Sequence, residues 1–397
     1  ALAGFAAALL AATAVQAQIS GDVVKIGVLN DMSGLYADIT GQGSVEAARM
    51  AIADFGGTVA GKKIGLVSAD HQNKPDVGGA IARQWYDNDG VDVIVDVPTS
   101  SVALAVQDIA RERKKVFLIS GAAASDLTGK ACSATGIHWT YDTVALANGT
   151  GSAVVKAGGD TWFFITADYA FGHALERDTA AVVTATGGKV LGQVRVPLNT
   201  PDFSSYLLQA QASKAKIVGL ANAGGDTINS IKQAAEFGLV EGGQKLAGLL
   251  VFITDINSLG LKAANGLQLT EAFYWDQTDE TRAWSKRFME KINHAPTMVQ
   301  AGVYGAVTHY LNAIKAINSD DGLTVVKKMK ETPVNDVMTK NGKILENGRV
   351  IRDMYLFEVK KPADSKGPWD YYKQISTIPG DEAFKRPGGN ECPLVKG

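Results

Sequence analysis

Short apolar runs alternate with amphipathic stretches along most of this chain, and this alternation limits the possible folds more than any other feature. A run of four to eight residues rich in Val and Ile has the length and composition of a buried strand. Between the runs, apolar residues recur every three or four positions, as on one face of a helix; Val45, Ala48 and Ile52 are an example. The strands predicted in the first part of the chain are Val23–Leu29, Lys63–Ala69, Val91–Val97 and Val116–Ser120.

The same rhythm begins again after about Tyr141. A chain of 397 residues is long for one core and comfortable for two lobes. A repeated strand–helix order predicts a parallel sheet with helices on both faces, so we expect an α/β fold with two similar lobes. The strands predicted in the second part are Thr161–Thr166, Val190–Val196, Ile217–Ala221, Leu249–Thr254, Leu267–Phe273 and Met354–Lys360.

The first residues have a different composition. Ala1 to Ala14 carry no charge, and the small-x-small triplet Val15-Gln16-Ala17 follows them. This pattern predicts a signal peptide over residues 1–17 and export to the periplasm. The basic start of such a peptide is missing, so we expect the sequence to begin within it. A membrane anchor is the alternative, which the shortness of the apolar segment disfavours.

Two cysteines, Cys132 and Cys392, follow in the exported part. An isolated pair in an exported protein favours a disulfide, and two free buried thiols are the alternative. The formal net charge is only −2, which excludes a strongly basic surface and therefore argues against a nucleic-acid partner.

Sequence signatures of catalysis and of cofactor binding are absent. There is no G-x-S-x-G motif, and the five histidines form no H-E-x-x-H motif. Gly56 to Lys62 nearly matches a phosphate-binding loop, but Lys63 follows where Ser or Thr is needed, and the segment leads from a helix into a strand. Gly41-x-Gly43 lacks the third glycine of a dinucleotide-binding turn. We therefore expect a binding protein without a cofactor or a metal, and not an enzyme.

Ligands of open α/β sheets bind at the carboxyl ends of the strands, so the loops at these ends are the candidate site. The hydroxyl groups of Thr99, Ser100 and Ser101, beside a helix N-terminus, suit a carboxylate. Alternatively, Ser100 or Ser101 is only a helix cap. The loop Gly121–Asp126 has small side chains that let a ligand approach the backbone, or it is simply a tight connection.

The second part of the chain offers aromatic and polar groups at the corresponding places. Tyr169 and Phe171 lie between a strand and a helix, where two rings could flank an apolar or aromatic ligand. The alternative is that these rings pack into the core of their own lobe. Asn222 and Asp226, in the Gly-rich loop after another strand, add a polar group and an acid at a helix start.

Taken in order, these segments resemble the leucine/isoleucine/valine-binding protein family of type I periplasmic solute-binding proteins. The resemblance covers nearly all of Val24 to Lys360, and it rests on four segments: Lys25–Leu29 with Ser33-Gly34 behind it, Ser120–Ala123, Asp168–Gly172 and the Gly-rich turn after Ala221. It implies two Rossmann-like lobes with parallel central sheets, joined by three crossing strands. It also implies a monomer that carries a small solute to the membrane permease of an ABC importer.

The resemblance gives the expected lobes and ligand contacts. Lobe 1 would hold residues 22–141 and 274–350, lobe 2 residues 142–273 and 351–380, and the tail residues 381–397.

Where amino-acid binders of this family place an acid for the ligand's ammonium group, this chain has Phe252, with Asp255 close by. We therefore expect an aromatic acid in preference to a branched-chain amino acid. A ligand-sensing ectodomain is the alternative of another class. The expected ligand contacts are Tyr36, Thr99, Ser100, Ser101, Ala122, Ala123, Ser125, Tyr141, Tyr169, Phe171, Asn222, Asp226 and Phe252.

Overall fold

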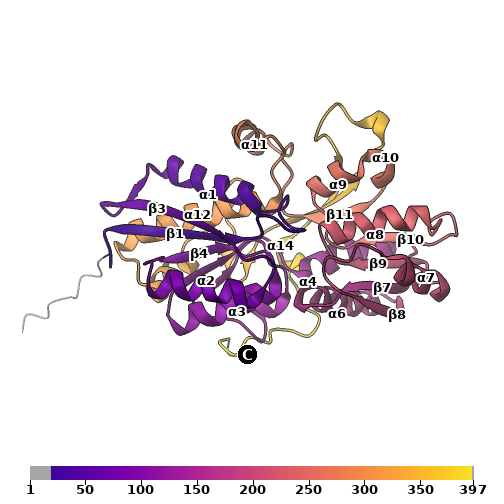
Figure 1. Cartoon of the computed structure of the whole chain (residues 1–397), viewed down its shortest axis with the longest axis horizontal. Coiled ribbons are helices and arrows are strands. Elements are labelled where there is room, and N and C mark those ends of the chain that lie inside the picture. Colours follow the sequence, from indigo (N-terminus) through magenta and orange to yellow (C-terminus); the bar gives the residue numbers. More distant parts are fainter. Residues whose placement is uncertain (1–18, 396–397) are drawn as a thin grey trace, which may run out of the picture.

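The computed structural model describes residues 19–395, which form two α/β lobes side by side (Figure 1). The predicted signal peptide, residues 1–17, lies outside the described residues. Within residues 19–395, none of the helices combines the length and the apolar character that crossing a membrane requires.

Lobe 1 is built on a six-stranded sheet. Its strands are β1 (Val23–Asn30), β2 (Thr58–Val59), β3 (Lys62–Asp70), β4 (Val93–Asp96), β5 (Val116–Ile119) and β6 (Gly136–His138). They lie in the order β2-β3-β1-β4-β5-β6, and all pairs are parallel except the short edge pair β2–β3. The predicted parallel sheet of the first lobe is thus confirmed.

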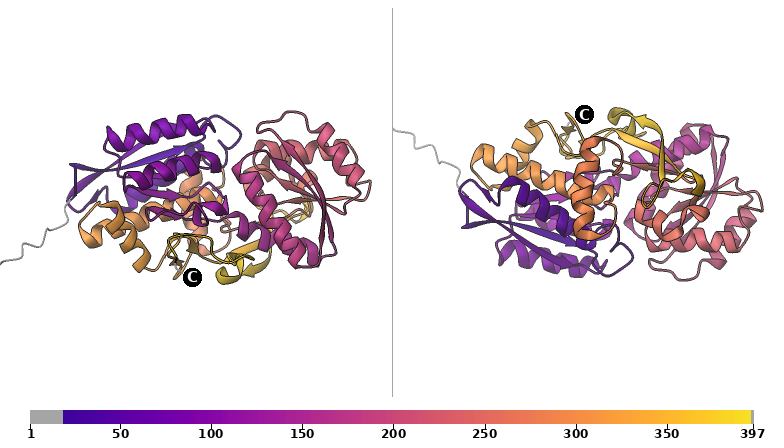
Figure 2. Two further views of the ribbon diagram at one scale, coloured as in Figure 1. Left: turned by 90° about the horizontal axis from the view of Figure 1, so that it is seen from below. Right: turned by 90° about the horizontal axis from the view of Figure 1, so that it is seen from above.

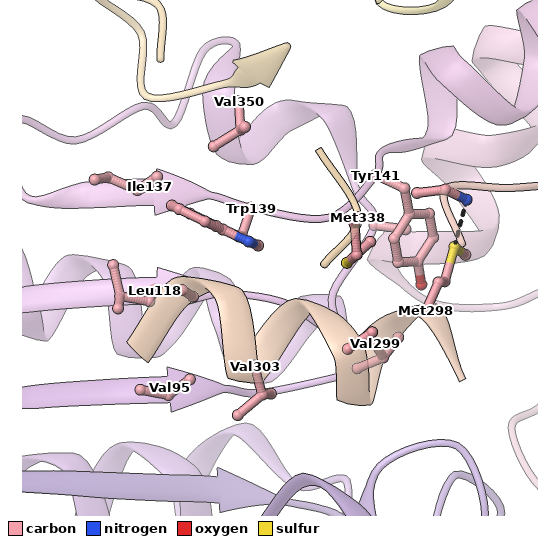
Figure 3. Packing of buried hydrophobic residues seen from close by; sticks show 14 of the residues in the cluster. Val95, Leu118, Ile137, Trp139, Tyr141, Met298, Val299, Val303, Met338 and Val350 are labelled. Atoms are coloured by element: carbon pink, nitrogen blue, oxygen red, sulfur yellow. Dashed lines mark hydrogen bonds between the residues drawn. The ribbon is translucent and has the colours of Figure 1, made fainter. Parts of the chain in front are cut away.

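Helices cover both faces of this sheet. They are α1 (Gly41–Phe55), α2 (Pro75–Asp87), α3 (Ser100–Glu112), α12 (Met298–Ile317) and α13 (Gly322–Glu331), while α11 (Asp279–Ile292) packs on α1. Because side chains alternate along a strand, Val95 and Leu118 face α1 and α12, whereas Ile94 and Phe117 face α2 and α3. Figure 3 shows α12 lying over β4, β5 and β6, with Val303 directed towards the sheet.

Lobe 2 repeats this arrangement on a smaller sheet. Its strands β7 (Thr161–Ala167), β8 (Lys189–Val196), β9 (Ile217–Ala221) and β10 (Lys245–Gly248) are all parallel, in the order β10-β9-β7-β8. Its helical segments are α4 (Thr143–Leu146), η2 (Ala147–Gly151), α5 (Ser152–Lys156), α6 (Ala170–Ala185), α7 (Ser204–Ser213), α8 (Gly225–Glu236), α9 (Ile253–Leu259) and α10 (Leu261–Ala264).

A third, antiparallel sheet joins the lobes. It contains β11 (Gln268–Glu271), β14 (Met354–Val359) and β15 (Tyr372–Ile378), in the order β11-β14-β15, and α14 (Gly380–Ala383) follows it. A two-stranded ribbon of β12 (Lys343–Ile344) and β13 (Val350–Ile351) lies in the part of lobe 1 just before β14. The chain passes between the lobes after β6, after β11 and after β13, which confirms the three predicted crossings.

One predicted strand was wrong, and another was predicted in the wrong sheet. Leu249–Thr254 is not a strand, because β10 ends at Gly248 and α9 begins at Ile253. The run is apolar because Leu249, Leu250 and Phe252 are buried against other parts of the chain, and burial alone does not make a strand. Leu267–Phe273 does contain β11, but this strand pairs with β14 and not with the parallel sheet of lobe 2. The sheet that β11 joins is decided by its pairing with β14, about ninety residues later in the chain, and the hydrophobic pattern of β11 alone does not indicate this partner.

The C-terminal part of the chain contains β15 and α14. The predicted disulfide is present: Cys132 and Cys392 are bonded, with their Cα atoms 5.6 Å apart. The bridge therefore attaches the end of the chain to lobe 1 across a sequence separation of 260 residues.

Candidate ligand-binding site

A small cavity lies between the two lobes. Every residue of its lining follows the carboxyl end of a parallel strand, from β1, β4, β5 and β6 of lobe 1 and from β7, β9 and β10 of lobe 2. This is the edge at which open α/β sheets bind ligands. The lining residues are Tyr36, Ile39, Pro98, Gly121, Ala123, Tyr141, Tyr169, Phe171, Ala223, Leu250 and Phe252.

The lining is apolar and aromatic, and it contains no charged residue among the described residues. Phe252 meets Tyr141 edge to face, with 6.4 Å between ring centroids and an interplanar angle of 84°. The rings of Tyr169 and Phe171 lie 5.9 Å apart. A flat apolar ligand would therefore meet ring edges and faces on several sides, which is favourable for another aromatic ring.

The phenol groups of this lining are hydrogen-bonded to the protein. Tyr141 donates to the carbonyl oxygen of Gly121 at 2.8 Å, and the hydroxyl oxygens of Tyr36 and Tyr169 are 2.5 Å apart. Burial raises the pKa of all three phenols, so they stay neutral at physiological pH.

The lobes touch each other directly beside the cavity. The backbone N–H of Gly225 donates to the carbonyl oxygen of Leu35 at 3.3 Å. Gly224 has a φ of +56°, and a Cβ atom on it would lie 2.4 Å from the same oxygen, so only glycine fits there. Together with the Tyr36–Tyr169 pair, this contact shows that the structure has closed lobes.

A polar network that sequence reasoning missed holds the loop of Tyr36. The carboxylate of Asp31 accepts from the N–H groups of Gly34 and Tyr36 at 2.7 and 2.9 Å, and from the side chain of Asn73 at 2.6 Å. Asn73 in turn accepts from the hydroxyl of Thr99. The loops after β1, β3 and β4 are thus fixed to one another. The signal in the sequence was Asp31 two residues before Ser33-Gly34, a common way to close a turn.

The hydroxyl of Ser100, at the start of α3, stabilises the loop after β5. Its oxygen accepts from the N–H groups of Ala123 and Ala124 at 3.3 and 3.1 Å. Thr99 is the N-cap residue of α3, but its side chain accepts no hydrogen bond from the first turn of this helix. The backbone N–H groups of that turn therefore lack this cap, and they begin two residues after Pro98, which lines the cavity.

Six of the expected ligand contacts, Tyr36, Ala123, Tyr141, Tyr169, Phe171 and Phe252, line the cavity. The others lie outside the lining. Thr99 and Ser100 make the bonds just described. Ala122 is fully buried in the core of lobe 1, and Ser101 is half-buried in the first turn of α3. Gly121 belongs to a loop that was predicted as part of the site, whereas sequence reasoning missed Ile39, Pro98, Ala223 and Leu250, whose side chains carry no polar group to mark them.

Three polar residues that were expected near the ligand are bound to other parts of the protein. Ser125 donates to Asp178 at 2.6 Å. Asn222 is bonded to Thr227 and Ser230 of the following helix α8, at 2.7 and 2.8 Å. The carboxylate of Asp226 accepts from the N–H groups of Asn199 and Thr200 at 3.0 and 3.1 Å, so it holds the loop after β8.

Several carboxyl groups lie near the cavity without lining it. Burial raises the pKa of Asp226 to about 6 and that of Asp255 to about 7, and Asp255 accepts from the N–H of Phe252 at 2.9 Å. Burial also raises the pKa of Asp96 to about 7. A Cβ atom on Gly121 would lie 2.8 Å from Oδ1 of Asp96, so this glycine allows the close packing behind the cavity.

Comparison with known proteins extends this picture to the whole chain. A family model described as periplasmic binding protein matches residues 23–367. The chain belongs to the periplasmic binding protein family. This binding protein is similar in structure to a periplasmic binding protein from Burkholderia mallei, with 54% identity and a TM-score of 0.93, over 94% of this chain and 100% of that one.

A second similar structure is a branched-chain amino acid ABC transporter periplasmic ligand-binding protein from Burkholderia xenovorans. It is 42% identical, with a TM-score of 0.83, over 94% of this chain and 99% of that one. Among curated proteins, a Leu/Ile/Val-binding protein homolog from Brucella melitensis is 25% identical over 97% of this chain and 98% of its own length. The resemblance to the leucine/isoleucine/valine-binding proteins is thus confirmed.

Proposed function

We propose that this periplasmic binding protein is the solute receptor of an ABC importer and closes around a small aromatic carboxylate. The observation that carries the proposal is the lining of the cavity, in which five aromatic rings and no charged residue are found among the described residues. An aromatic ring gains the most from such walls, because it buries apolar area and makes edge contacts at the same time.

An amino-acid ligand fits this lining less well. An ammonium group in a closed cavity costs several kcal/mol unless a carboxylate pairs with it. Two acids near the cavity are used elsewhere, since Asp226 accepts from two backbone N–H groups after β8 and Asp255 accepts from the N–H of Phe252. Both acids also have raised pKa values, which weakens them as permanent counter-charges.

The carboxylate end of the ligand would meet lobe 1. The first turn of α3 follows Pro98, so its backbone N–H groups lie at this edge of the cavity. The N-terminus of a helix favours an anion without a buried cation. The fold itself can hold such a ligand, since a Rhodopseudomonas palustris solute-binding protein with the same fold, 21% identical, has been crystallised with benzoate.

Isothermal titration with benzoate, phenylalanine and leucine tests the proposal. Benzoate should bind at least about tenfold more tightly than either amino acid, which corresponds to 1.4 kcal/mol. The competing function is branched-chain amino-acid binding, which the description of the Burkholderia xenovorans protein favours. Submicromolar leucine binding without benzoate binding would establish that function and overturn ours.

We further propose that the protein works as a periplasmic monomer that releases its ligand to a membrane permease and catalyses no reaction. Its family and its relatives are binding proteins, which supports this role. A receptor gains thermal stability from its ligand without converting it. Benzoate that is recovered unchanged after long incubation, together with a raised melting temperature, is the expected result. Disappearance of benzoate would indicate an enzyme.

A further inference from the structure

The segment from Gly380 to Cys392, here called the C-terminal strap, is bonded to both lobes. Figure 2 shows the C-terminal end of the chain beside the boundary between the lobes. The strap contains α14 and continues to the disulfide with lobe 1. No part of the proposed ligand site belongs to it.

On lobe 2, one side chain holds the strap. The amide nitrogen of Asn148, in η2, donates to the carbonyl oxygens of Glu382, Ala383 and Lys385, at 3.2, 2.9 and 2.9 Å. A side-chain amide that meets three carbonyl oxygens of one segment recognises the backbone path of that segment, and not its side chains.

On lobe 1, the strap has two attachments. The guanidinium of Arg386 donates to the carbonyl oxygen of Ser125 at 2.7 Å and to the hydroxyl of Thr128 at 2.8 Å. The disulfide of Cys392 follows six residues later. The consecutive residues Lys385 and Arg386 are therefore bonded to opposite lobes, so little slack separates the two attachments.

The strap also covers the places where the chain crosses between the lobes. Phe384 lies against the buried guanidinium of Arg349, 4.7 Å from the carbon of that group to the ring centroid. Arg349 donates to the carbonyl oxygen of Tyr141, at the first crossing, at 2.7 Å. At the third crossing, the carboxylate of Asp353 accepts from the N–H of Gly380 at 3.0 Å. Any rotation about these crossings must move the strap as well.

We propose that the C-terminal strap is a tether that limits how far the two lobes open. The closed arrangement described above contains all its attachments at the same time. Opening moves lobe 2 away from lobe 1 and therefore strains the short connection between Asn148 and Arg386. The tether shifts the ligand-free protein towards small openings, and this raises ligand affinity because less rearrangement is needed on binding.

Small-angle scattering of the ligand-free protein tests the tether, and it needs no knowledge of the ligand. Asn148→Ala frees the strap from lobe 2, and the double variant Cys132→Ser/Cys392→Ser frees it from lobe 1. The exposed Asn265, which lies in lobe 2 away from the strap, gives the matched control Asn265→Ala. Both strap variants should have a larger radius of gyration than the wild type, whereas Asn265→Ala should not.

Benzoate affinity is the second measurement, and about a fivefold loss is expected in the strap variants. If benzoate binds no form of the protein, the proposed ligand is wrong, and the radius of gyration still decides on the tether. An unchanged or smaller radius in Asn148→Ala, with a wild-type melting temperature, would overturn the proposal. Should the cysteine variant not fold, Arg386→Ala replaces it as the release from lobe 1.

Discussion

The hydroxyl oxygens of Tyr36 and Tyr169 lie 2.5 Å apart, and their hydrogen bond joins the loop after β1 to the loop after β7 across the cleft. Both rings also line the cavity. The same two side chains therefore contact the ligand space and link the lobes, so closure and binding are coupled at this pair.

Replacing either phenol by phenylalanine should weaken closure while keeping the walls of the cavity. Tyr36→Phe and Tyr169→Phe should each raise the dissociation constant of benzoate by about twofold to tenfold, as expected for one net hydrogen bond. The loss of binding free energy in the double variant should be smaller than the sum of the losses in the two single variants, because both single variants remove the same shared hydrogen bond. Titration calorimetry on all four proteins measures this coupling, and strictly additive losses would show that the two hydroxyls act independently.

Phe252 should matter for the ligand more than for stability. Phe252→Leu removes a ring of the cavity wall, which should lower benzoate affinity by about 1 kcal/mol, the usual value of a contact between two aromatic rings. Phe288, fully buried in the core of lobe 1, is the matched control. Phe288→Leu should reduce the melting temperature without changing affinity. Equal affinity losses in the two variants would remove Phe252 from the site.

Asp96 should make stability depend on pH. Burial raises its pKa from 3.8 to about 7, so the folded protein keeps a proton that the unfolded chain releases. Its contribution to stability is therefore full below about pH 4 and is lost as pH rises through about 7, at up to about 1.4 kcal/mol per pH unit. Asp96→Asn should flatten this part of the profile in urea titrations. The exposed Asp22 supplies the control Asp22→Asn, which should leave the wild-type slope.

The disulfide should contribute a large part of the free energy of unfolding. It closes a loop with a sequence separation of 260 residues, for which chain entropy gives an upper estimate of about 5 kcal/mol. Chemical denaturation of Cys132→Ser/Cys392→Ser without reductant measures the loss. Denatured wild-type protein should take up no thiol label before reduction. Two labelled thiols per chain would show that the bridge does not form.

The strands and helices of both lobes could be predicted because the hydrophobic pattern that specifies each element lies within the residues of that element. Val95 and Ile94 face opposite sides of one sheet, and a run without polar alternation is what such a strand requires. The loops of the site were predictable for the same reason, since Tyr169 and Phe171 directly follow a predicted strand. Leu250 and Phe252 could not be placed in this way, because an apolar run has the same appearance in a strand and in a buried loop.

The sequence by itself determined the two-lobed α/β fold, the cysteine pair and the loops from which a ligand site could be built, because periodicity and loop position are local properties. Only the tertiary structure decided which groups in these loops face the ligand space. Asn222, Asp226 and Ser125 are polar residues in the expected loops, yet each is bonded to a neighbour and lies outside the cavity. A buried polar group takes whichever partner the fold brings within reach, and the partners of Ser125 and Asp226 come from other elements of the chain.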